Sequence, residues 1–452
     1  CGCVRMSIIS GTAKSAGGGY QIERSLRFRT SATGKLTKTY GGAGTSRKLC
    51  TISMWVKRNK VASTLNTWPG LFGVNSSGYT YADEFAFRGD QECIGMIFDG
   101  TLAGELRSTN IYRDPSAWMH VLASVNITGQ TSKIYVNGTE VTYTVNTQPS
   151  TSFNHSFGHS VAHTIGRRHY NGEANDIQIA EMYFIDGQAL TPSSFGETSA
   201  TTGAWDPIAY AGTYGTNGFY LPFSDNSAAT AATIGADSSG NGNNWTPSGI
   251  SVTAGVTNDS LTDTPTNYGT DTGAGGEVRG NYCTINAISQ YTTPSLLSGG
   301  NLTLSGSNPS HRTNWLPSTG KFYFEVDCTT VGSGGYLVGG AQSLYRVDGS
   351  RWTGAAWVAY GASYTSGDRI GCEIDLTNNT VEWFKNQTSQ GLITSAGLAR
   401  NGVDDWTGGD LTGTWTAHWN FGQRPYARTA NSGFKALCTQ NLPDPAINKA
   451  SQ

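Results

Sequence analysis

The stretch that decides the fold is 367–391, GDRIGCEIDLTNNTVEWFKNQTSQG. Apolar alternation on either side of a polar turn is followed by a second turn at Asn386-Gln387. An earlier stretch, 118–141 (WMHVLASVNITGQTSKIYVNGTEV), has the same organisation and its own turn at Asn137-Gly138. Alternation with a period of two is typical of strands, and Asn-Gly supplies the positive φ angles of a tight hairpin. The repeat predicts two parts built as the same kind of sandwich, in which the hairpin is structural.

The bulk composition agrees with a β-rich chain. It has 452 residues, enough for two domains, and contains 59 Gly, 21 Tyr and 12 Trp. Aromatic residues favour strands and glycines favour turns, whereas windows rich in helix-forming residues are scarce. We therefore predict an all-β fold.

Charge and hydropathy exclude two classes of partner. The net charge is −2 and only 14% of the residues are charged. A nucleic-acid binder needs a basic face to meet phosphates, so we expect no nucleic-acid partner. No run of 18 apolar residues occurs, so we expect no membrane insertion.

The eight cysteines are scattered, and we interpret them as free thiols, several on buried strands such as those containing Cys328 and Cys372. One alternative is that Cys1 is the lipid-modified end of a mature chain. Another is that Met6 is the true start.

Composition divides the chain into five parts. Residues 1–22 are rich in Gly and Ser and predict an arm or attachment segment. Strand patterns occupy 23–225 and 281–427, separated by a polar connector at 226–280. The tail at 428–452 contains two prolines that interrupt regular structure, and we expect it to lead into further domains if the chain is a fragment.

The first strand-rich part resembles a laminin-G-like, concanavalin-type jelly roll. The resemblance rests on Trp118-x-His120-Val121, on 133–138 (KIYVNG), and on 179–185 (IAEMYFI) followed by 188–191 (QALT). These motifs occur in family order, and the family has a structural histidine where His120 stands.

The second strand-rich part resembles a SPRY domain. Its motifs also follow family order and are 320–325 (GKFYFE), 367–371 (GDRIG), 375–376 (DL), 382–386 (EWFKN) and 420–422 (NFG). SPRY domains are themselves concanavalin-like sandwiches. The two resemblances imply an all-β chain of two concanavalin-like antiparallel β-sandwich (jelly-roll) domains joined by a Gly/Ser/Thr/Asn-rich connector.

The order of the modules resembles that in tail fibres and other virion-surface proteins of tailed bacteriophages. Further phrases that carry this resemblance are 20–28, 184–191, 237–245, 263–267, 433–437 and 441–443. It implies a structural virion-surface protein that adheres to a host glycan or protein. It also implies a homotrimer that contacts other virion proteins through the N-terminal arm.

Two other classes of protein are also consistent with the sequence. The first is a bacterial surface or secreted lectin-like adhesin, which a lipid on Cys1 would favour. The second is a polysaccharide-degrading enzyme. Retaining glycosidases need two carboxyls about 5 Å apart, and the nearest candidates, Glu173, Asp176 and Glu181, have the wrong spacing on a strand. We expect solvated edge charges there and assign no catalytic residue.

Two stretches contain metal-ligating residue types. His155, His159, His163 and His169 lie in a Gly- and Ser-rich segment without helical spacing, so we interpret them as polar loop or strand residues. Asp237, Ser239, Asn241 and Asn243 resemble the front half of a calcium loop, although Ser248 stands where the bidentate Glu is expected. The alternative for this second stretch is an Asx-turn loop; we otherwise expect no cofactor.

Aromatic loops supply the candidate ligand-binding residues. SPRY domains usually bind through loops at one end of the sandwich, and here 345–360 gathers Tyr345, Arg351, Trp352 and Trp357. Exposed aromatic rings beside arginine suit a sugar or peptide. The alternative is that Trp357 and Tyr360 pack in the core. Trp68, Tyr79 and Tyr81 form a second candidate loop in the first module.

Overall fold

A computed structural model describes most of the chain, namely residues 19–59, 69–74, 82–89, 91–168, 176–200, 202–271, 278–287, 296–307, 311–314, 317–340, 342–394, 396, 398, 408–410 and 413–442. These residues form two compact units. The N-terminal unit lies within 19–253 and 257–266, and the C-terminal unit within 254–256 and 267–442. The prediction of an all-β fold is confirmed, because the helical turns among the described residues are short 3-10 turns at Thr30–Ala32, Asp99–Thr101, Pro192–Ser194 and Thr439–Asn441.

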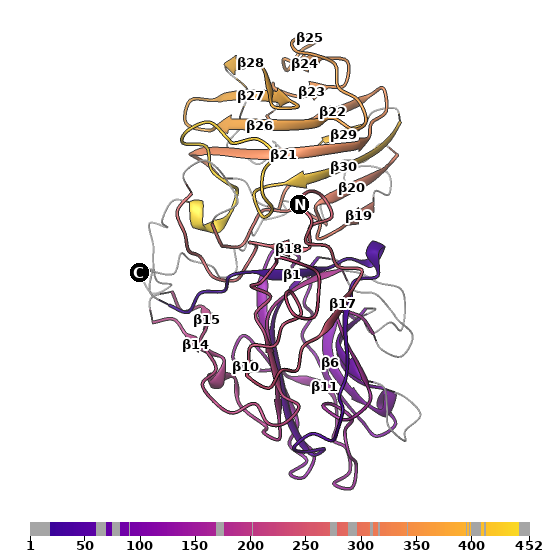
Figure 1. Cartoon of the computed structure of the whole chain (residues 1–452). Helices are drawn as coiled ribbons and strands as arrows, with labels where there is room; N and C mark the ends of the chain where they lie inside the picture. Colours follow the sequence, from indigo (N-terminus) through magenta and orange to yellow (C-terminus); the bar gives the residue numbers. More distant parts are fainter. Residues whose placement is uncertain are drawn as a thin grey trace, which may run out of the picture. The chain divides into compact units, whose positions relative to one another are not determined.

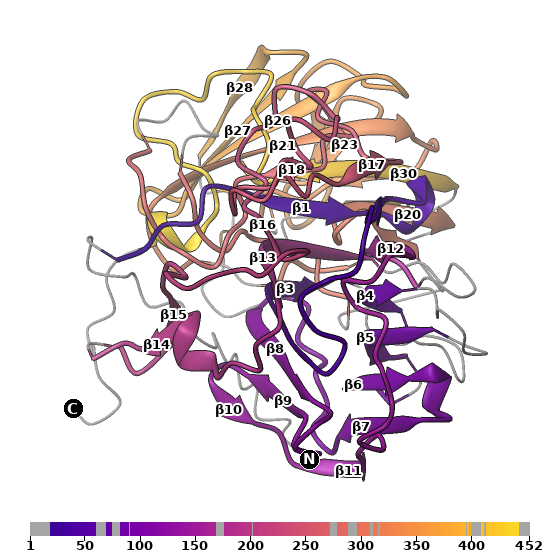
Figure 2. The ribbon, with the colours of Figure 1, turned by 60° about the horizontal axis from the view of Figure 1, so that its bottom comes forward.

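The N-terminal unit is a sandwich of two antiparallel sheets, whose strands face one another in Figure 2. The first sheet has the order β10-β9-β8-β3-β13-β1-β18, and β16 also pairs with β13. Its strands are β1 (Ser25–Phe28), β3 (Leu49–Arg58), β8 (Trp118–Asn126), β9 (Lys133–Val136), β10 (Thr139–Glu140), β13 (Ile177–Asp186), β16 (Phe219–Leu221) and β18 (Ser260–Leu261).

The second sheet of this unit has the order β11-β7-β6-β5-β4-β12-β2-β17. Its strands are β2 (Lys35–Thr39), β4 (Gly70–Val74), β5 (Asp83–Arg88), β6 (Cys93–Phe98), β7 (Gly104–Ser108), β11 (Tyr143–Thr147), β12 (Ala162–Ile165) and β17 (Thr246–Ser248). A small separate ribbon pairs β14 (Gly196–Thr198) with β15 (Trp205–Pro207).

The core of the N-terminal unit lies between its two sheets and is made by alternate residues of the long strands. Ile52, Met54 and Val56 of β3 face it together with Val121 and Ala123 of β8. The alternation in 118–126 and 133–136 therefore produces the predicted pair of strands, which lie next to each other in register. Asn137 and Gly138 have φ of 48° and 78°, the left-handed conformation that the hairpin turn requires.

The C-terminal unit contains a seven-stranded sheet and a five-stranded sheet, both antiparallel (Figure 1). The first has the order β19-β20-β30-β21-β26-β27-β28 and the second the order β25-β24-β23-β22-β29. The seven strands are β19 (Leu296–Ser298), β20 (Thr303–Ser307), β21 (Lys321–Thr330), β26 (Arg369–Asp375), β27 (Thr380–Lys385), β28 (Thr388–Thr394) and β30 (Thr414–Asn420). The five are β22 (Gly335–Leu337), β23 (Tyr345–Arg346), β24 (Ser350–Trp352), β25 (Trp357–Ala359) and β29 (Gly408–Asp410).

The quoted stretch 367–391 forms β26, β27 and most of β28, and its alternation places Ile370, Cys372 and Ile374 in the core beside Trp383. Asn386 and Gln387 both have positive φ in the turn between β27 and β28. The hairpins of the two units are thus parts of sheets, as the repeat predicts.

Residues of the predicted connector form strands of the N-terminal unit, and residues of the predicted tail pack in the C-terminal unit. Within 226–280, β17 pairs with β2 and β18 pairs with β1. Within 428–452, Leu437 is buried in the core of the C-terminal unit. The boundaries at 22, 225, 280 and 427 stay predictions, and most of the predicted N-terminal arm lies outside the described residues.

The six described cysteines, Cys50, Cys93, Cys283, Cys328, Cys372 and Cys438, are all buried free thiols. Burial raises the pKa of Cys438 to about 12 and that of Cys50 well above its ordinary value. No helix in the described part of the chain is long and apolar enough to cross a membrane.

Candidate functional site

The aromatic candidates of the C-terminal unit lie on the hairpin of β24 and β25, at one edge of the five-stranded sheet. Trp352 and Trp357 are directly opposite each other, and their ring centroids are 5.5 Å apart at 58°. Such a cross-strand aromatic pair stabilises a hairpin, and here the turn 353–356 closes with a hydrogen bond from the Thr353 amide to the Ala356 carbonyl. Both rings are only half-buried, so each leaves part of its surface accessible to solvent.

One arginine lies against this pair, and a second lies on the opposite face of the hairpin. The guanidinium of Arg346 lies 5.2 Å from the ring centroid of Trp357, a cation–π distance. Arg346 also contacts Asp348, with 3.5 Å between the charged atoms. Arg351 donates a hydrogen bond of 3.2 Å to the Gln342 carbonyl, which holds it along the edge of the hairpin. Side chains alternate between the two faces of a sheet, so Arg346, Trp352 and Trp357 share one face, whereas Arg351, opposite Tyr345 and Val358, lies on the other.

Tyr345 occupies a different position. Its side chain is fully buried, packs against Trp383 and donates a hydrogen bond to the Ala362 carbonyl. Tyr360 also packs against the core of the unit, whereas Trp357 is outside that cluster. Because Tyr345 presents no surface to a ligand in this structure, we expect it to support the hairpin and not to touch the ligand. Trp68, Tyr79 and Tyr81 lie outside the described residues.

The loop 237–243 is built around the carboxylate of Asp237. This group accepts hydrogen bonds from the amides of Tyr220, Ser239 and Asn243 and from the Ser239 hydroxyl, at 2.7–2.9 Å. The side-chain amides of Asn241 and Asn243 donate to carbonyls of 215–218. Asp237 is thus the centre of an Asx-type turn that fastens the loop to the neighbouring 215–218 segment. Its oxygens are engaged with hydrogen-bond donors, and calcium at these residues stays a prediction.

Two histidines of the histidine-rich segment, His155 and His163, are buried, His159 is partly exposed, and His169 lies outside the described residues. His155 is buried, and desolvation lowers its pKa to about 3. His163 accepts a 2.9 Å hydrogen bond from the Gly158 amide at Nε2 and contacts the Val161 carbonyl through Nδ1. Among the described residues no group of three or more His, Cys, Asp or Glu side chains is placed to hold a metal ion.

His120 is likewise enclosed. Its Nε2 lies 2.8 Å from the Ser53 hydroxyl, its Nδ1 accepts a 3.2 Å hydrogen bond from the Trp205 indole, and burial lowers its pKa to about 3. Both ring nitrogens have partners, and such an arrangement suits a structural histidine.

The expectation of solvated edge charges is wrong for Asp176 and Glu181, because both are buried, and Glu173 lies outside the described residues. The surroundings of Glu181 show why it is buried. It is buried in β13, at a bulge where its φ is 52° and the register with β3 shifts. The hydroxyls of Tyr20, Tyr183 and Tyr220 donate to its carboxylate at 2.7–3.0 Å. Burial raises the pKa of Glu181 to about 7, and the three phenol donors oppose the shift. The sequence did not reveal this cluster, because Tyr20 and Tyr220 are far away along the chain.

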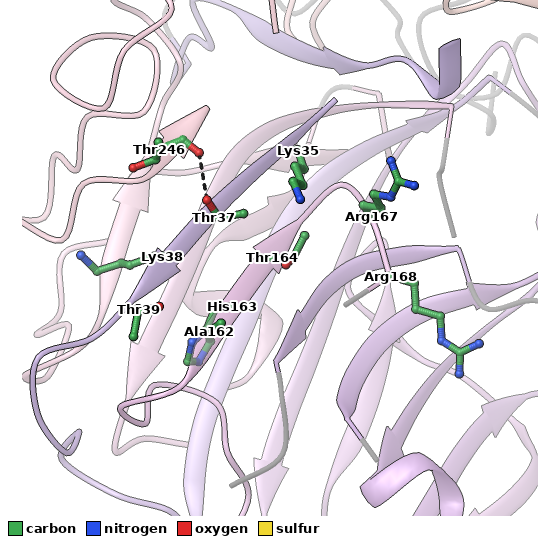
Figure 3. Close-up of a pocket in the computed structure, with 10 residues that line it drawn as sticks. All are labelled: Lys35, Thr37, Lys38, Thr39, Ala162, His163, Thr164, Arg167, Arg168 and Thr246. Carbon is green, nitrogen blue, oxygen red and sulfur yellow. Dashed lines mark hydrogen bonds between the residues drawn. The ribbon is translucent and has the colours of Figure 1, made fainter. Parts of the chain in front are cut away.

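A pocket of about 390 Å³ on the second sheet of the N-terminal unit was also missed (Figure 3). It lies over β2, β12 and β17, and its described lining is Lys35, Thr37, Lys38, Thr39, Ala162, His163, Thr164, Arg167, Arg168 and Thr246. No motif marks it, because its residues come from three separate segments.

The chain is thus an all-β protein with two sandwich units. Its candidate binding surfaces are the hairpin of β24 and β25 and the pocket over β2, β12 and β17. A sequence profile of the laminin-G type, described as the concanavalin A-like lectin/glucanase superfamily, matches residues 31–194. The N-terminal unit thus contains a region similar to concanavalin-like lectins and glucanases.

Solved structures with partial similarity include sandwiches of several kinds. One is a native heptameric SAP-like pentraxin from Limulus polyphemus (12% identity, 38% of this chain and 80% of that chain, TM-score 0.28). Another is a putative carbohydrate-binding protein from Bacteroides ovatus (14%, 50% and 58%, TM-score 0.34). A third is the SPRY domain of human HERC1 (15%, 30% and 96%, TM-score 0.23). No curated protein matches the chain.

Proposed function

We propose that this protein is a non-enzymatic adhesin that binds host-surface glycans through the hairpin of β24 and β25. The observation that carries the proposal is the half-exposed pair Trp352 and Trp357 with the Arg346 guanidinium beside the Trp357 ring. A tryptophan face stacks on the apolar face of a sugar ring, and arginine supplies directional donors to its hydroxyls. A protein ligand that offers an aromatic or proline side chain is the alternative occupant.

The N-terminal unit supports binding rather than hydrolysis. The superfamily similar to residues 31–194 includes lectins as well as glucanases. Glu181, the buried carboxyl nearest to the pattern of a glucanase, is enclosed by three tyrosine hydroxyls. Catalysis by retention needs a second carboxyl about 5 Å away and access for the sugar. We therefore assign this chain no catalytic role.

We further propose that the protein is displayed on the virion surface of a tailed phage, as a tail fibre, spike or decoration protein. The support is the order of a laminin-G-like and a SPRY-like module with the connector phrases at 237–245 and 263–267. In this proposal residues 1–22 contact other virion proteins. A homotrimer would multiply weak sugar sites into strong attachment.

Binding is tested with labelled full-length protein on a glycan array and on host cells. Trp352→Ala is expected to weaken attachment about thirtyfold, equivalent to about 2 kcal/mol, because it removes one stacking face. Arg346→Ala should weaken it less, because it removes the guanidinium beside Trp357. Arg351→Ala, on the other face of the hairpin, should weaken it least. Leu392→Ala, which removes a side chain 60% exposed elsewhere in the unit, is the matched control. Unchanged attachment of folded Trp352→Ala and Arg346→Ala proteins would place the site elsewhere.

Location is tested separately by mass spectrometry of purified phage particles and by light scattering of the free protein. Mass spectrometry is expected to find peptides of this chain in the particles. Light scattering is expected to give three times the molar mass of one chain. A lipid on Cys1 together with absence from the particles would instead select a bacterial surface adhesin.

A further inference from the structure

The pocket of the N-terminal unit is built by the pleat of three adjacent strands. Thr164 of β12 is opposite Thr37 of β2, and Thr37 is opposite Thr246 of β17. These three residues share one face of the sheet, because side chains alternate between the two faces. The residues between them along the strands, including Leu36 and Ile165, face the core. A row of hydroxyl-bearing side chains therefore crosses the outer face.

Four basic residues stand around this row, and no acidic residue occurs among the described lining residues. Two of the four are engaged. Arg168 forms an ion pair with buried Glu84 at 2.8 Å, and Lys38 donates to the Asn244 carbonyl at 3.2 Å. Figure 3 shows these two side chains extending away to opposite sides.

Lys35 and Arg167 differ from the other two. Both are half-exposed, and neither has a side-chain hydrogen bond or ion pair within the described part of the chain. In Figure 3 both are drawn on the same side of Thr164. The backbone that carries Arg167 lies close to β4, because Gly70 has no side chain: a Cβ there would be 2.8 Å from Arg168 Cα. This packing and the Arg168–Glu84 ion pair together hold the backbone at Arg167 and Arg168 in place.

From this geometry we infer that the pocket is a second binding site, for a negatively charged sugar. The volume of about 390 Å³ lies in the range of roughly 300–1,000 Å³ that small-molecule sites occupy. Guanidinium and ammonium groups pair with a carboxylate or phosphate, and guanidinium does so in a bidentate manner. Threonine hydroxyls both donate to and accept from ring hydroxyls. Stacking contributes little, since the only ring in the described lining is the buried one of His163.

This site goes beyond the proposed function, because it belongs to a different unit from the tryptophan hairpin and uses a different chemistry. In a chain with a net charge of only −2, two basic side chains that have no partner among the described residues stand beside a row of hydroxyls and give the pocket a local preference for anions.

The test measures binding of small sugars to the full chain by ligand-observed NMR and calorimetry. The matched probes are methyl β-glucuronide and methyl β-glucoside, which differ in one carboxylate. Glucose 6-phosphate tests the other anionic group, and inorganic phosphate tests an anion without a sugar. Glucuronide or glucose 6-phosphate is expected to bind at least tenfold more tightly than glucoside and than inorganic phosphate.

The variants locate the site. Arg167→Gln is expected to weaken binding of the charged sugar about tenfold, and Lys35→Gln about fivefold. Thr37→Val, which keeps the branched shape that suits a strand, should weaken it a few-fold through loss of a hydroxyl. Lys133→Gln is the control, because it removes the same charge from an exposed lysine paired with Glu140 in the other sheet. Melting temperatures of all variants report whether they fold.

Several outcomes would overturn the inference. They are equal binding of glucoside, equal binding of inorganic phosphate, and full affinity in a folded Arg167→Gln protein. Loss of charged-sugar binding in Trp352→Ala would assign that binding to the hairpin. If neither charged sugar binds while glycan attachment still depends on Trp352, the second site is wrong and the proposed adhesin function stands.

Discussion

Each unit buries a glutamate that fastens a segment onto a sheet, but the two do so with different partners. In the N-terminal unit, Glu181 accepts only phenol hydroxyls from Tyr20, Tyr183 and Tyr220. In the C-terminal unit, Glu373 accepts from the Arg428 guanidinium at 2.7 Å and from the backbone and side-chain amides of Asn431.

The difference is the presence of a positive charge. Neutral donors compensate part of the desolvation of a carboxylate, so the pKa of Glu181 stays raised to about 7. An arginine beside the carboxylate compensates the charge directly. The same residue type therefore has a raised pKa at Glu181 and is half of an ion pair at Glu373.

The largest expected effect comes from removing that positive charge. Arg428→Met leaves Glu373 buried without its cation, and breaking a buried pair typically costs about 3–5 kcal/mol. The hydrogen bonds from Asn431 remain, so we expect the lower end, about 3 kcal/mol, measured by denaturant unfolding at pH 7. Loss below 1 kcal/mol would show that the amides alone sustain the carboxylate. Lys435→Met, a charge change in the same segment, is the control.

The next effect is a pH dependence of the N-terminal unit. Because the pKa of Glu181 is about 7 when folded and 4.5 ordinarily, the fold prefers the neutral acid. The contribution of Glu181 to the free energy of unfolding is thus fully present below about pH 4.5. It falls by about 3 kcal/mol as the pH rises to 7. Glu181→Gln should lack this fall. Calorimetry of both proteins from pH 4.5 to 8 checks it, with Glu140→Gln, exposed on β10, as the control. Parallel curves would contradict the prediction.

A smaller effect concerns support of the hairpin. Tyr345→Phe removes the hydrogen bond to the Ala362 carbonyl but keeps the buried ring. We expect a loss of about 1 kcal/mol in stability, the typical net value of one hydrogen bond. Glycan affinity should change less than twofold in the folded protein. A large loss of affinity with unchanged stability would mean that Tyr345 contacts the ligand.

The smallest effect separates the two candidate surfaces by salt. Binding at Lys35 and Arg167 should weaken up to about fivefold between 50 mM and 500 mM salt, since half-exposed ion pairs contribute about 1 kcal/mol or less. Stacking on Trp352 carries no net charge, so attachment through the hairpin should change much less. The prediction is wrong if salt weakens binding at the pocket and attachment through the hairpin by the same factor, in titrations of the same preparation.

Local pattern was enough to predict the strands and their turns. The period of two in 118–126 and 370–375 and the positive φ at Asn137 and Asn386 follow from the residues themselves. The same kind of reasoning singled out Trp352 and Trp357, because both stand within one short stretch. Whether they bind a ligand stays a prediction.

The remaining features depend on register and distance along the chain. The bulge shifts the core-facing positions of β13 from Ile177 and Ile179 to Met182 and Phe184, so Glu181 lies on the other face of the strand with Tyr183. Two of its three tyrosine partners are 161 and 39 residues away, so the sequence gives no sign of the cluster. Thr37 and Thr246 meet only because β17 pairs with β2. Tyr345 shows the converse: an aromatic residue in a promising loop is fully buried, because its strand faces the core.

The buried cysteines have a practical consequence. A thiolate is the reactive form of cysteine, and burial both disfavours it and blocks access to reagents. The six described thiols should therefore stay silent towards a thiol-modifying dye until their surroundings open. Three of them, Cys283, Cys328 and Cys372, lie in the core of the C-terminal unit, and Cys50 lies in that of the N-terminal unit. The native cysteines can thus report unfolding, because peptide mapping shows which of them has reacted with the dye. No cysteine has to be introduced for this purpose.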